Sequence, residues 1–272
     1  MADKYAVVGN PIAHSKSPII HAAFAKQTHQ DISYEPILAP LDGFETTING
    51  LIAQGYKGVN VTVPFKFEAY NVCESLSARL ASSGTGAVNT LININGKIHG
   101  DNTDGIGLRT DIEKNIGFSI ANKHILILGA GGAAHGILNS LSGASSITIA
   151  NRTHERALTL VMGIQDCEAK ASSFEALEKP YDLIINATSA GLTDTALPIS
   201  NVIFGKNCLA YDMMYGRETP FMAQAKAAGA QVADGLGMLV EQAAEAFYLW
   251  RQVRPDTQPV MLMVRTLQMG TA

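Results

Sequence analysis

Short apolar runs alternate with longer amphipathic stretches along the whole chain. Apolar runs of about four to eight residues are typical of buried strands, and apolar residues about 3.6 positions apart are typical of helices that face a core. The pattern predicts strands at Tyr5–Val8, Ser33–Leu38, Gly58–Val63, Thr90–Ile94, His124–Leu128, Ser146–Ala150, Leu183–Asn186, Cys208–Tyr211 and Ala230–Val232. It predicts helices at Ser17–Gln27, Asp42–Gln54, Pro64–Val72, Asp104–Asn115, Gly132–Leu141, His154–Met162, Pro220–Ala228 and Gly237–Gln252.

Strands that alternate with helices indicate βαβ units and mostly parallel sheets. One continuous doubly wound sheet would satisfy the pattern, but a second strand–glycine–helix unit begins afresh at His124, and this favours two domains. We expect an N-terminal α/β domain of residues 1–103 and 237–272, and a second α/β domain of residues 104–236, separated by a cleft. The C-terminal stretch is helical without a strand of its own, so we expect it to return to the first domain.

The composition argues for an ordinary globular protein without a nucleic-acid or membrane partner. The chain has 272 residues, 47% of them hydrophobic and 16% charged, with a formal net charge of -4 and no run of Lys or Arg. No stretch approaches the ~18 uninterrupted apolar residues of a membrane helix. The N-terminus enters an apolar run at Tyr5 without the features of a signal peptide. We therefore expect a soluble protein.

The cysteines and histidines suggest neither a disulfide framework nor a metal centre. Cys73, Cys167 and Cys208 are far apart and form no CxxC pair, which fits a reducing cytoplasm. The histidines show no HExxH or similar ligand spacing. The expected localisation is therefore cytoplasmic, and no metal is expected.

A glycine-rich turn predicts a dinucleotide site. The apolar run Ile125–Leu128 leads into Gly129, Ala130, Gly131, Gly132, Ala133 and Ala134, followed by a helical pattern. This is GxGxxA in a strand–turn–helix setting, where the glycines permit a tight turn and close approach of the backbone to a pyrophosphate. A glycine turn that binds nothing is the alternative interpretation.

The next strand distinguishes the two nicotinamide cofactors. Asn151, Arg152 and Thr153 follow Ser146–Ala150, where an NAD enzyme usually has an acid that binds the ribose 2′-hydroxyl. An arginine instead suits a 2′-phosphate, and Arg156 lies one helical turn further on. The residues therefore favour NADP as the cofactor, with solvated arginines as the alternative.

Three polar segments are candidates for substrate binding and catalysis. Ser15 and Ser17 precede a helix, where Ser17 would either cap the helix or, with Ser15, bind a carboxylate or several hydroxyls. Asn60 and Thr62 alternate at the end of a strand, so we expect both side chains on one face. Pro64 then opens a helix with Lys66 in its first turn.

At that position the positive end of the helix dipole disfavours the ammonium form of Lys66, which suits a lysine that exchanges a proton in general acid–base catalysis. A lysine that merely faces solvent is the alternative. Asp104, in the polar turn Gly100–Gly105, would be an N-cap or a functional carboxylate. Asn89, at a strand start, offers both a donor and an acceptor.

Taken together, these segments resemble the shikimate dehydrogenase family, over Tyr5 to about Pro259. The matching segments are Gly9–Ile12 with Ser15–Pro18, Asn60–Lys66, Gly86–Thr90, Asp101–Gly105, Gly129–Ala133, Asn151–Thr153, Asn186–Ser189, Tyr211–Tyr215 and Asp234–Leu239. The resemblance implies an N-terminal domain that binds shikimate and a Rossmann domain that binds NADP. It implies reversible reduction of 3-dehydroshikimate to shikimate, in the biosynthesis of aromatic amino acids, by a monomer or homodimer.

The resemblance also assigns roles to individual residues. Lys66 would exchange a proton with the reacting oxygen, and Asp104 would orient the lysine and a substrate hydroxyl. The substrate would be surrounded by Ser15, Ser17, Asn60, Thr62, Asn89, Tyr215 and Gln242, with the serines on its carboxylate. The cofactor would be lined by Gly129, Ala130, Gly131, Gly132, Ala133, Asn151, Arg152, Thr153, Arg156, Thr188, Met213, Gly235 and Met238.

The chain departs from the family near Ala78, where many members carry an acid close to the nicotinamide side. Ala78 lies in a longer, Ser-rich segment from Ser75 to Ser83, so that contact is in doubt while the catalytic pair is unaffected. Two rival functions remain. One is a quinate/shikimate dehydrogenase with relaxed cofactor choice, and the other is a non-catalytic NADP-binding regulator on the same fold.

Overall fold

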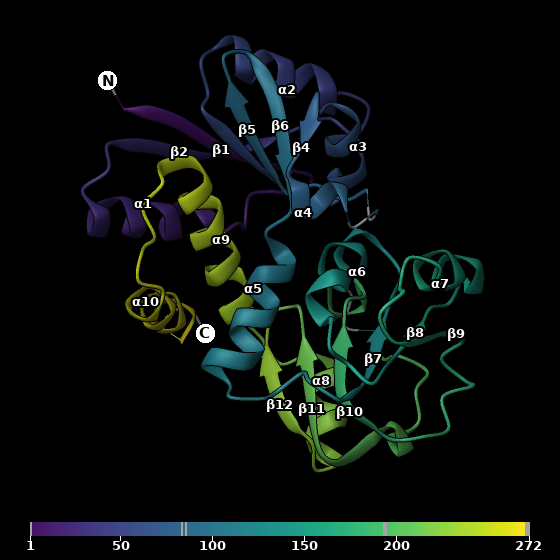
Figure 1. Cartoon of the computed structure of the whole chain (residues 1–272). Coiled ribbons are helices and arrows are strands. Elements are labelled where there is room, and N and C mark those ends of the chain that lie inside the picture. Colours follow the sequence, from purple (N-terminus) through teal and green to yellow (C-terminus); the bar gives the residue numbers. More distant parts are fainter. Residues whose placement is uncertain (1, 83, 85, 193–194, 270–272) are drawn as a thin grey trace. The chain divides into compact units, whose positions relative to one another are not determined.

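The structure is a computed structural model that describes residues 2–82, 84, 86–192 and 195–269. Contacts divide the chain into two compact units (Figure 1). Unit 1 comprises the described residues of Met1–Gly107 and Leu239–Ala272, and unit 2 comprises those of Leu108–Met238. The chain thus leaves unit 1 once, forms unit 2 from one continuous segment, and returns.

Unit 1 contains a six-stranded mixed sheet in the order β2-β1-β3-β5-β6-β4. β1 pairs parallel with β2 and β3, and β4 pairs parallel with β6, whereas β5 pairs antiparallel with both β3 and β6. The strands are β1 (Asp3–Gly9), β2 (Ile32–Leu38), β3 (Gly58–Val61), β4 (Ser75–Leu76), β5 (Thr90–Ile94) and β6 (Lys97–Asp101). The mostly parallel α/β architecture expected from the sequence is confirmed.

Helices cover both faces of this sheet (Figure 1). Period-2 alternation places Ala6, Val8 and Val61 on the face that packs against α2, α3 and α4. On the other side Tyr5 stacks on Trp250, and Phe24 packs against Phe247. The helices are α1 (Ser17–Thr28), α2 (Phe44–Ala53), α3 (Lys66–Asn71), α4 (Ala78–Ala81), α9 (Leu236–Arg251) and α10 (Gln258–Met269).

Unit 2 contains a fully parallel six-stranded sheet in the order β12-β11-β10-β7-β8-β9. The order reverses between β7 and β10, as in a Rossmann fold, and ligands of such sheets bind at the carboxyl ends of the strands near this reversal. The strands are β7 (His124–Leu128), β8 (Ser146–Ala150), β9 (Glu168–Ser172), β10 (Tyr181–Asn186), β11 (Phe204–Asp212) and β12 (Gln231–Asp234).

Two apolar clusters sandwich the sheet of unit 2. Ile125 and Ile127 join the cluster that contains Ile137 of α6 (Gly132–Ile137) and residues of α7 (His154–Val161). Leu126 and Leu128 point to the opposite face, where they join the cluster of α8 (Pro220–Ala227). The strand is therefore apolar at every position because it is buried on both faces. The helix α5 (Asp104–Thr110) continues as a π-helical turn, Asp111–Asn115.

The sequence pattern missed three strands, β4, β6 and β9. Each is short and largely polar, and β4 and β9 lie at sheet edges, so none shows an apolar run. Within β6, only Ile98 is an apolar residue that enters the core. Ser83, the end of the Ser-rich segment, lies outside the described residues.

Candidate functional site

The centre of the unit 1 site is an ion pair between the Lys66 ammonium and Asp104 Oδ2. Lys66 is the first residue of α3, and its backbone carbonyl accepts a hydrogen bond from Val88 N at the approach to β5. Asp104 is the first residue of α5. Their side chains are 13% and 8% exposed, so water reaches the pair only partly, and its attraction is stronger than that of a surface pair. Lys66 does not simply face solvent.

The second carboxylate oxygen of Asp104 is held by a buried asparagine. Asn89 Nδ2 donates to Asp104 Oδ1 at 2.8 Å and to Thr103 Oγ1 at 3.0 Å. Asn89 Oδ1 accepts from Thr103 N and Thr90 Oγ1, both at 2.8 Å. These bonds determine the orientation of the Asn89 amide, and Asp104 N is itself bonded to Asn102 Oδ1 at 2.9 Å. Asp104 is the first residue of α5 rather than the residue that precedes the helix, and its carboxylate binds Lys66 and Asn89.

The network extends from Asn89 across the sheet. Asn60 and Thr90 are paired across β3 and β5, and Asn60 Nδ2 donates to Thr90 Oγ1 at 3.2 Å. Tyr34 Oη donates to Asn60 Oδ1 at 2.8 Å. Thr103 Oγ1 and Asn89 Nδ2 also contact Gln242 Oε1 of α9, at 3.4 and 3.5 Å. The result is one connected set of polar side chains that includes residues of β2, β3, β5, α3, α5 and α9.

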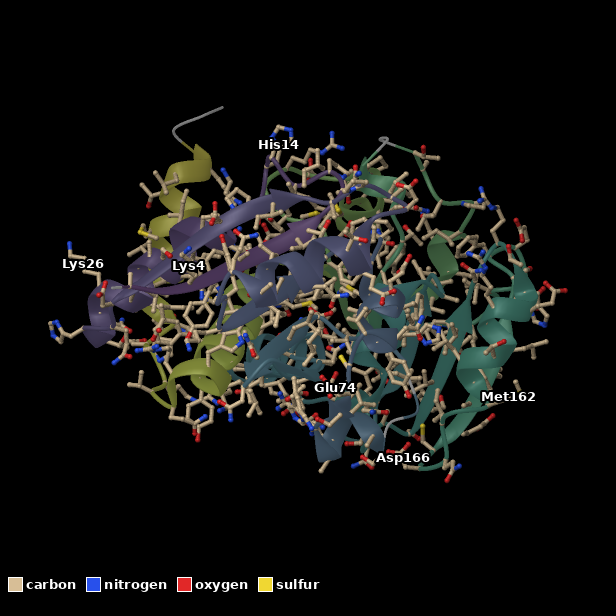
Figure 2. The ribbon with its side chains drawn as sticks, turned by 90° about the horizontal axis from the view of Figure 1, so that it is seen from above. Lys4, His14, Lys26, Glu74, Met162 and Asp166 are labelled. Carbon is tan, nitrogen blue, oxygen red and sulfur yellow. The ribbon has the colours of Figure 1, made fainter. Side chains whose placement is uncertain are left out.

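The two serines lie at the start of α1. Ser15 Oγ accepts from Ser17 N at 3.3 Å, and Ser17 is itself the first residue of the helix rather than its cap. The capping alternative for Ser17 is therefore wrong, and its side chain is buried in unit 1. His14, beside Ser15, is exposed and extends away from the ribbon (Figure 2).

Thr62 lies one residue beyond the end of β3, and its backbone N–H extends the parallel ladder to Val8 O at 2.9 Å. Its half-buried side chain packs at Gly9, where a Cβ would come within 2.4 Å of the Thr62 methyl group. Lys66 lies in the first turn of α3 as expected, although the helix begins two residues after Pro64.

In unit 2, the expected cofactor residues lie at the carboxyl ends of parallel strands. Gly129 follows β7 with φ of 104°, a conformation that favours glycine, and a Cβ there would crowd Ala187 at 3.1 Å. A Cβ at Gly131 would meet no atom within 4 Å. Ala133 is half-buried in α6, whose second turn passes into a 3₁₀ turn.

Two exposed arginines follow β8. Asn151 Nδ2 donates to Thr153 O at 2.8 Å, which shapes the turn before α7. Arg152 and Arg156 are both exposed, and neither forms an ion pair within the described residues. Their guanidinium groups face solvent, and no carboxylate of the described residues pairs with them. Such groups can bind an anionic ligand.

A buried polar cluster supports the ends of β10 and β11. Thr188 Oγ1 donates to Asn186 Oδ1 at 2.7 Å, and Asn186 Nδ2 donates to Asp212 Oδ2 at 3.1 Å. Thr219 Oγ1 adds a bond of 2.5 Å to Asp212 Oδ2. Burial raises the pKa of Asp212, against the lowering effect of its hydrogen bonds to Thr219, the Met214 backbone and Asn186. These bonds position Thr188 at the edge of the sheet where Rossmann ligands bind.

The remaining expected residues of unit 2 follow β11 and β12. Met213 N donates to Asn186 O at 3.0 Å, and Gly235 N donates to Met214 O at 2.9 Å. A Cβ at Gly235 would lie 2.3 Å from Met213 O, so only glycine fits there. Met238 is buried at the start of α9. Tyr215 also belongs to unit 2 and is half-buried, and burial raises the pKa of its phenol.

Several polar residues of the unit 1 network were not expected. Tyr34, Thr90, Asn102 and Thr103 carry many of its hydrogen bonds. Thr103 lies in Asp101–Gly105, one of the segments that resemble the family, and this position could have identified it as a site residue. The residues around Tyr34 predict only a strand and give no indication that its side chain belongs to the site.

The described residues contain no group of three or more His, Cys, Asp or Glu side chains that could hold a metal ion. None of their helices has both the length and the apolar content needed to cross a membrane.

Three family models match successive parts of the chain. The model of the shikimate dehydrogenase substrate-binding domain matches residues 7–91. That of shikimate/quinate 5-dehydrogenase matches residues 111–194, and that of the shikimate 5′-dehydrogenase C-terminal domain matches residues 235–261. The matches follow one another in order and span most of the chain.

Individual proteins match over nearly their full lengths. A shikimate dehydrogenase (NADP(+)) of Methylobacillus flagellatus is 55% identical over 269 residues, which cover 97% of this chain and 99% of the relative. The structure of an Ael1 enzyme from Pseudomonas putida is 42% identical with a TM-score of 0.88, covering 96% and 98%. The shikimate 5-dehydrogenase of Thermus thermophilus, solved with NADP(H) and shikimate, is 32% identical with a TM-score of 0.84, covering 97% and 99%.

Proposed function

The chain belongs to the shikimate dehydrogenase family, and on this premise we propose that it catalyses the reversible, NADP-dependent reduction of 3-dehydroshikimate to shikimate. The protein is thus an oxidoreductase that acts on a CH–OH group, with a place in the shikimate pathway. The observation that carries this proposal is the partly buried pair of Lys66 and Asp104 inside a polar network. A non-catalytic NADP-binding regulator does not require such a pair.

Lys66 is the proton donor and acceptor of the proposed reaction. Reduction of a ketone requires a proton at the oxygen, and the ammonium of Lys66 supplies it. In the reverse direction the neutral amine accepts the proton of the hydroxyl. The Asp104 carboxylate is hydrogen-bonded to Asn89 at 2.8 Å, so it orients the lysine and accepts a bond from a substrate hydroxyl.

The other polar groups of the site match a polyhydroxylated acid. Ser15 and Ser17, at the start of α1, would bind the carboxylate. Asn60, Thr62, Asn89 and Gln242 of unit 1 would bind ring hydroxyls, because amide and hydroxyl groups both donate and accept. For Tyr215 of unit 2, contact with the substrate stays a prediction from the family resemblance. A site with such buried polar groups discriminates strongly against analogues that lack a hydroxyl, since those analogues leave a group unpaired.

The residues of unit 2 fit NADP. The open space at Gly131 leaves room for a pyrophosphate. Arg152 and Arg156, which are exposed and have no ion-pair partner among the described residues, suit a 2′-phosphate. Gly129, Ala130, Gly131, Gly132 and Ala133 would hold the pyrophosphate, and Asn151, Arg152, Thr153 and Arg156 the adenosine ribose with its phosphate. Thr188, Met213, Gly235 and Met238 would line the remainder of the site. When bound, the cofactor supplies or accepts the hydride.

A spectrophotometric assay tests the proposal and its nearest rival. Purified protein is given shikimate with NADP⁺, and formation of the reduced nicotinamide is followed, with parallel reactions that contain quinate or NAD⁺. We expect efficient turnover of shikimate with NADP⁺ and much slower turnover in the other combinations. Comparable rates with quinate and NAD⁺ would instead establish the rival enzyme with relaxed cofactor choice, and no turnover at all would refute the proposed activity.

A further inference from the structure

A four-residue ionic cluster lies next to the polar network of unit 1. Arg79 of α4 donates through Nε and Nη2 to Asp101 Oδ1 and Oδ2, at 2.8 and 2.7 Å. The same guanidinium donates through Nη1 to Glu245 Oε1 of α9 at 2.8 Å, and Arg254 pairs with the other oxygen of Glu245. Asp101 and Glu245 are buried, being 2% and 5% exposed. We call Arg79, Asp101, Glu245 and Arg254 the arginine clamp.

One end of the clamp holds the turn that presents Asp104. Asp101 is the last residue of β6, and its backbone carbonyl accepts from Asn89 N at 3.1 Å. Its carboxylate also accepts from Asn102 N at 2.7 Å and from Ser77 Oγ at 2.8 Å. Asn102 in turn binds Asp104 N. A series of hydrogen bonds therefore connects Arg79 to Asp104 through Asp101 and Asn102.

The other end holds the helix that presents Gln242. Glu245 follows Gln242 by three residues on α9, so the two side chains share one face of the helix. Gln242 Oε1 contacts Thr103 Oγ1 and Asn89 Nδ2. One guanidinium thus links the turn of Asp104 to the helix of Gln242, and both of these side chains contact Asn89 Nδ2.

The charges explain why an arginine is needed. Asp101 is a second buried carboxylate three residues from Asp104, and a buried carboxylate that lacks a counter-ion is strongly unfavourable. The two oxygens of Asp101 match the planar, two-pronged geometry of Arg79, and the third donor of the same side chain remains available for Glu245. The pKa of Glu245 is lowered because its bonds to Arg254 and Arg79 outweigh the effect of burial. Glu245 therefore stays ionised in the clamp.

We propose that Arg79 is a positioning residue of the site, which holds Asp104 and Gln242 in register with Lys66 without contacting the substrate itself. The proposal rests on the proposed function. It assigns to α4, in the segment where the chain departs from its family, a role in the proton-transfer geometry of unit 1. Displacement of reacting groups by about 1 Å can cost about 100-fold in rate, so loss of the clamp should lower turnover without removing any catalytic group.

The first test is the steady-state kinetics of Arg79→Met with shikimate and NADP⁺. We expect kcat to fall by about 10- to 100-fold, while the KM for NADP⁺ is unchanged because the expected cofactor residues belong to unit 2. Arg79→Lys retains the charge but not the two-pronged geometry, and should recover part of the loss. The matched control is Arg251→Met. Arg251 lies on α9, as Glu245 does, and the substitution breaks its ion pair with Asp3 of β1, so kcat should be unchanged. An Arg79→Met enzyme with wild-type kcat would overturn the proposal.

A combined variant separates positioning from general destabilisation. If Arg79 acts through Asp104 and Gln242, Arg79→Met should slow an Asp104→Asn/Gln242→Ala enzyme by no more than about twofold, because residues that act as a unit are non-additive. If the loss caused by Arg79→Met is as large in this background as in the wild type, Arg79 does not act through these two residues and the proposal fails.

If Arg79→Met does not fold, the variant Arg79→Met/Asp101→Asn removes the uncompensated charge as well. A folded protein with low kcat would support the clamp, and one with wild-type kcat would refute it. Wild-type protein that does not oxidise shikimate would instead refute the proposed function, so the two failures are distinct.

Discussion

The Lys66 ammonium and the Asp104 carboxylate form an ion pair although the residues are 38 positions apart in sequence. Each begins a helix, and each follows a strand of the same sheet, β3 for Lys66 and β6 for Asp104. The intervening strand β5 begins beside Asn89, which binds the second oxygen of Asp104. The sheet therefore brings the pair together, and the predictions about turnover depend on this arrangement.

Asp104→Asn should lower kcat for shikimate oxidation by about 100-fold or more, because the neutral amide cannot stabilise the Lys66 ammonium or accept its bond with equal strength. The amide keeps the size of the carboxylate and one acceptor for Asn89, so the melting temperature should change little. Asp256→Asn, at an exposed position of the same unit, serves as the control. Unchanged turnover in Asp104→Asn would remove the carboxylate from the proposed chemistry.

Arg152→Ala should weaken the binding of NADP⁺ and leave that of NAD⁺ nearly unchanged, because only NADP⁺ carries the 2′-phosphate. Loss of a charge-assisted bond to the phosphate corresponds to about 1.5–3 kcal/mol, or roughly 10- to 150-fold in Kd. Fluorescence titration with both cofactors measures the ratio. The control is Arg109→Ala in the same unit, because Arg109 already pairs with Glu113 at 3.0 Å. Equal losses for the two cofactors would contradict this role.

Gly131→Ala should reduce NADP⁺ affinity without reducing stability. A Cβ at this position meets no protein atom within 4 Å, so the methyl group would project only into the space proposed for the pyrophosphate. Gly50→Ala, also without a neighbour within 4 Å, is a control that should leave cofactor binding intact. Thermal melting with and without NADP⁺ distinguishes the two effects, since a ligand stabilises only the protein that binds it. An unchanged shift of Tm would contradict the expected approach of the cofactor.

His21 should make unit 1 sensitive to acid. Its imidazole is fully buried, stacked on Tyr34 at 4.1 Å, and burial lowers its pKa to about 3 against a smaller opposing effect of Asn60. Because this folded pKa lies below the value of about 6.5 in the unfolded chain, the unfolded state takes up the proton first as the pH falls. His21 should therefore lower the free energy of unfolding by about 1.4 kcal/mol for each pH unit between about 6 and 3.

Denaturant titrations at several pH values measure this contribution. His21→Phe keeps an aromatic ring in the cluster but binds no proton, so its stability should depend less steeply on pH in that range. The exposed His154 provides the control His154→Gln, whose pH dependence should match the wild type. Parallel curves for His21→Phe and the wild type would show that His21 does not titrate on unfolding.

Much of the fold was predictable because buried parallel strands leave a strong apolar signal. The run Ile125–Leu128 is apolar at every position since α6 and α7 cover one face of its sheet and α8 the other. The strand β6 gave no such signal, because Lys97 and His99 alternate with Ile98 and Gly100. The turn Asn95–Gly96, with positive φ at both residues, is the hairpin signal that could have revealed it.

The site was predictable only in part. Lys66, Asp104 and Asn89 stand in short polar segments at strand ends, where side chains are free to serve a ligand. Their pairing depends on which strands are neighbours, and local sequence does not encode this. Tyr34 and Arg79 are further examples, because their bonds to Asn60 and Asp101 cross 26 and 22 residues and require the completed sheet.

The most direct measurement of the central claim is the single-turnover rate of Lys66→Ala with saturating shikimate and NADP⁺, together with the Kd for shikimate. Removal of the amine takes away the proton acceptor and leaves the hydroxyl- and carboxylate-binding groups in place. We expect the rate to fall by about 100-fold or more while Kd changes by less than about tenfold. A wild-type rate in Lys66→Ala would contradict the account.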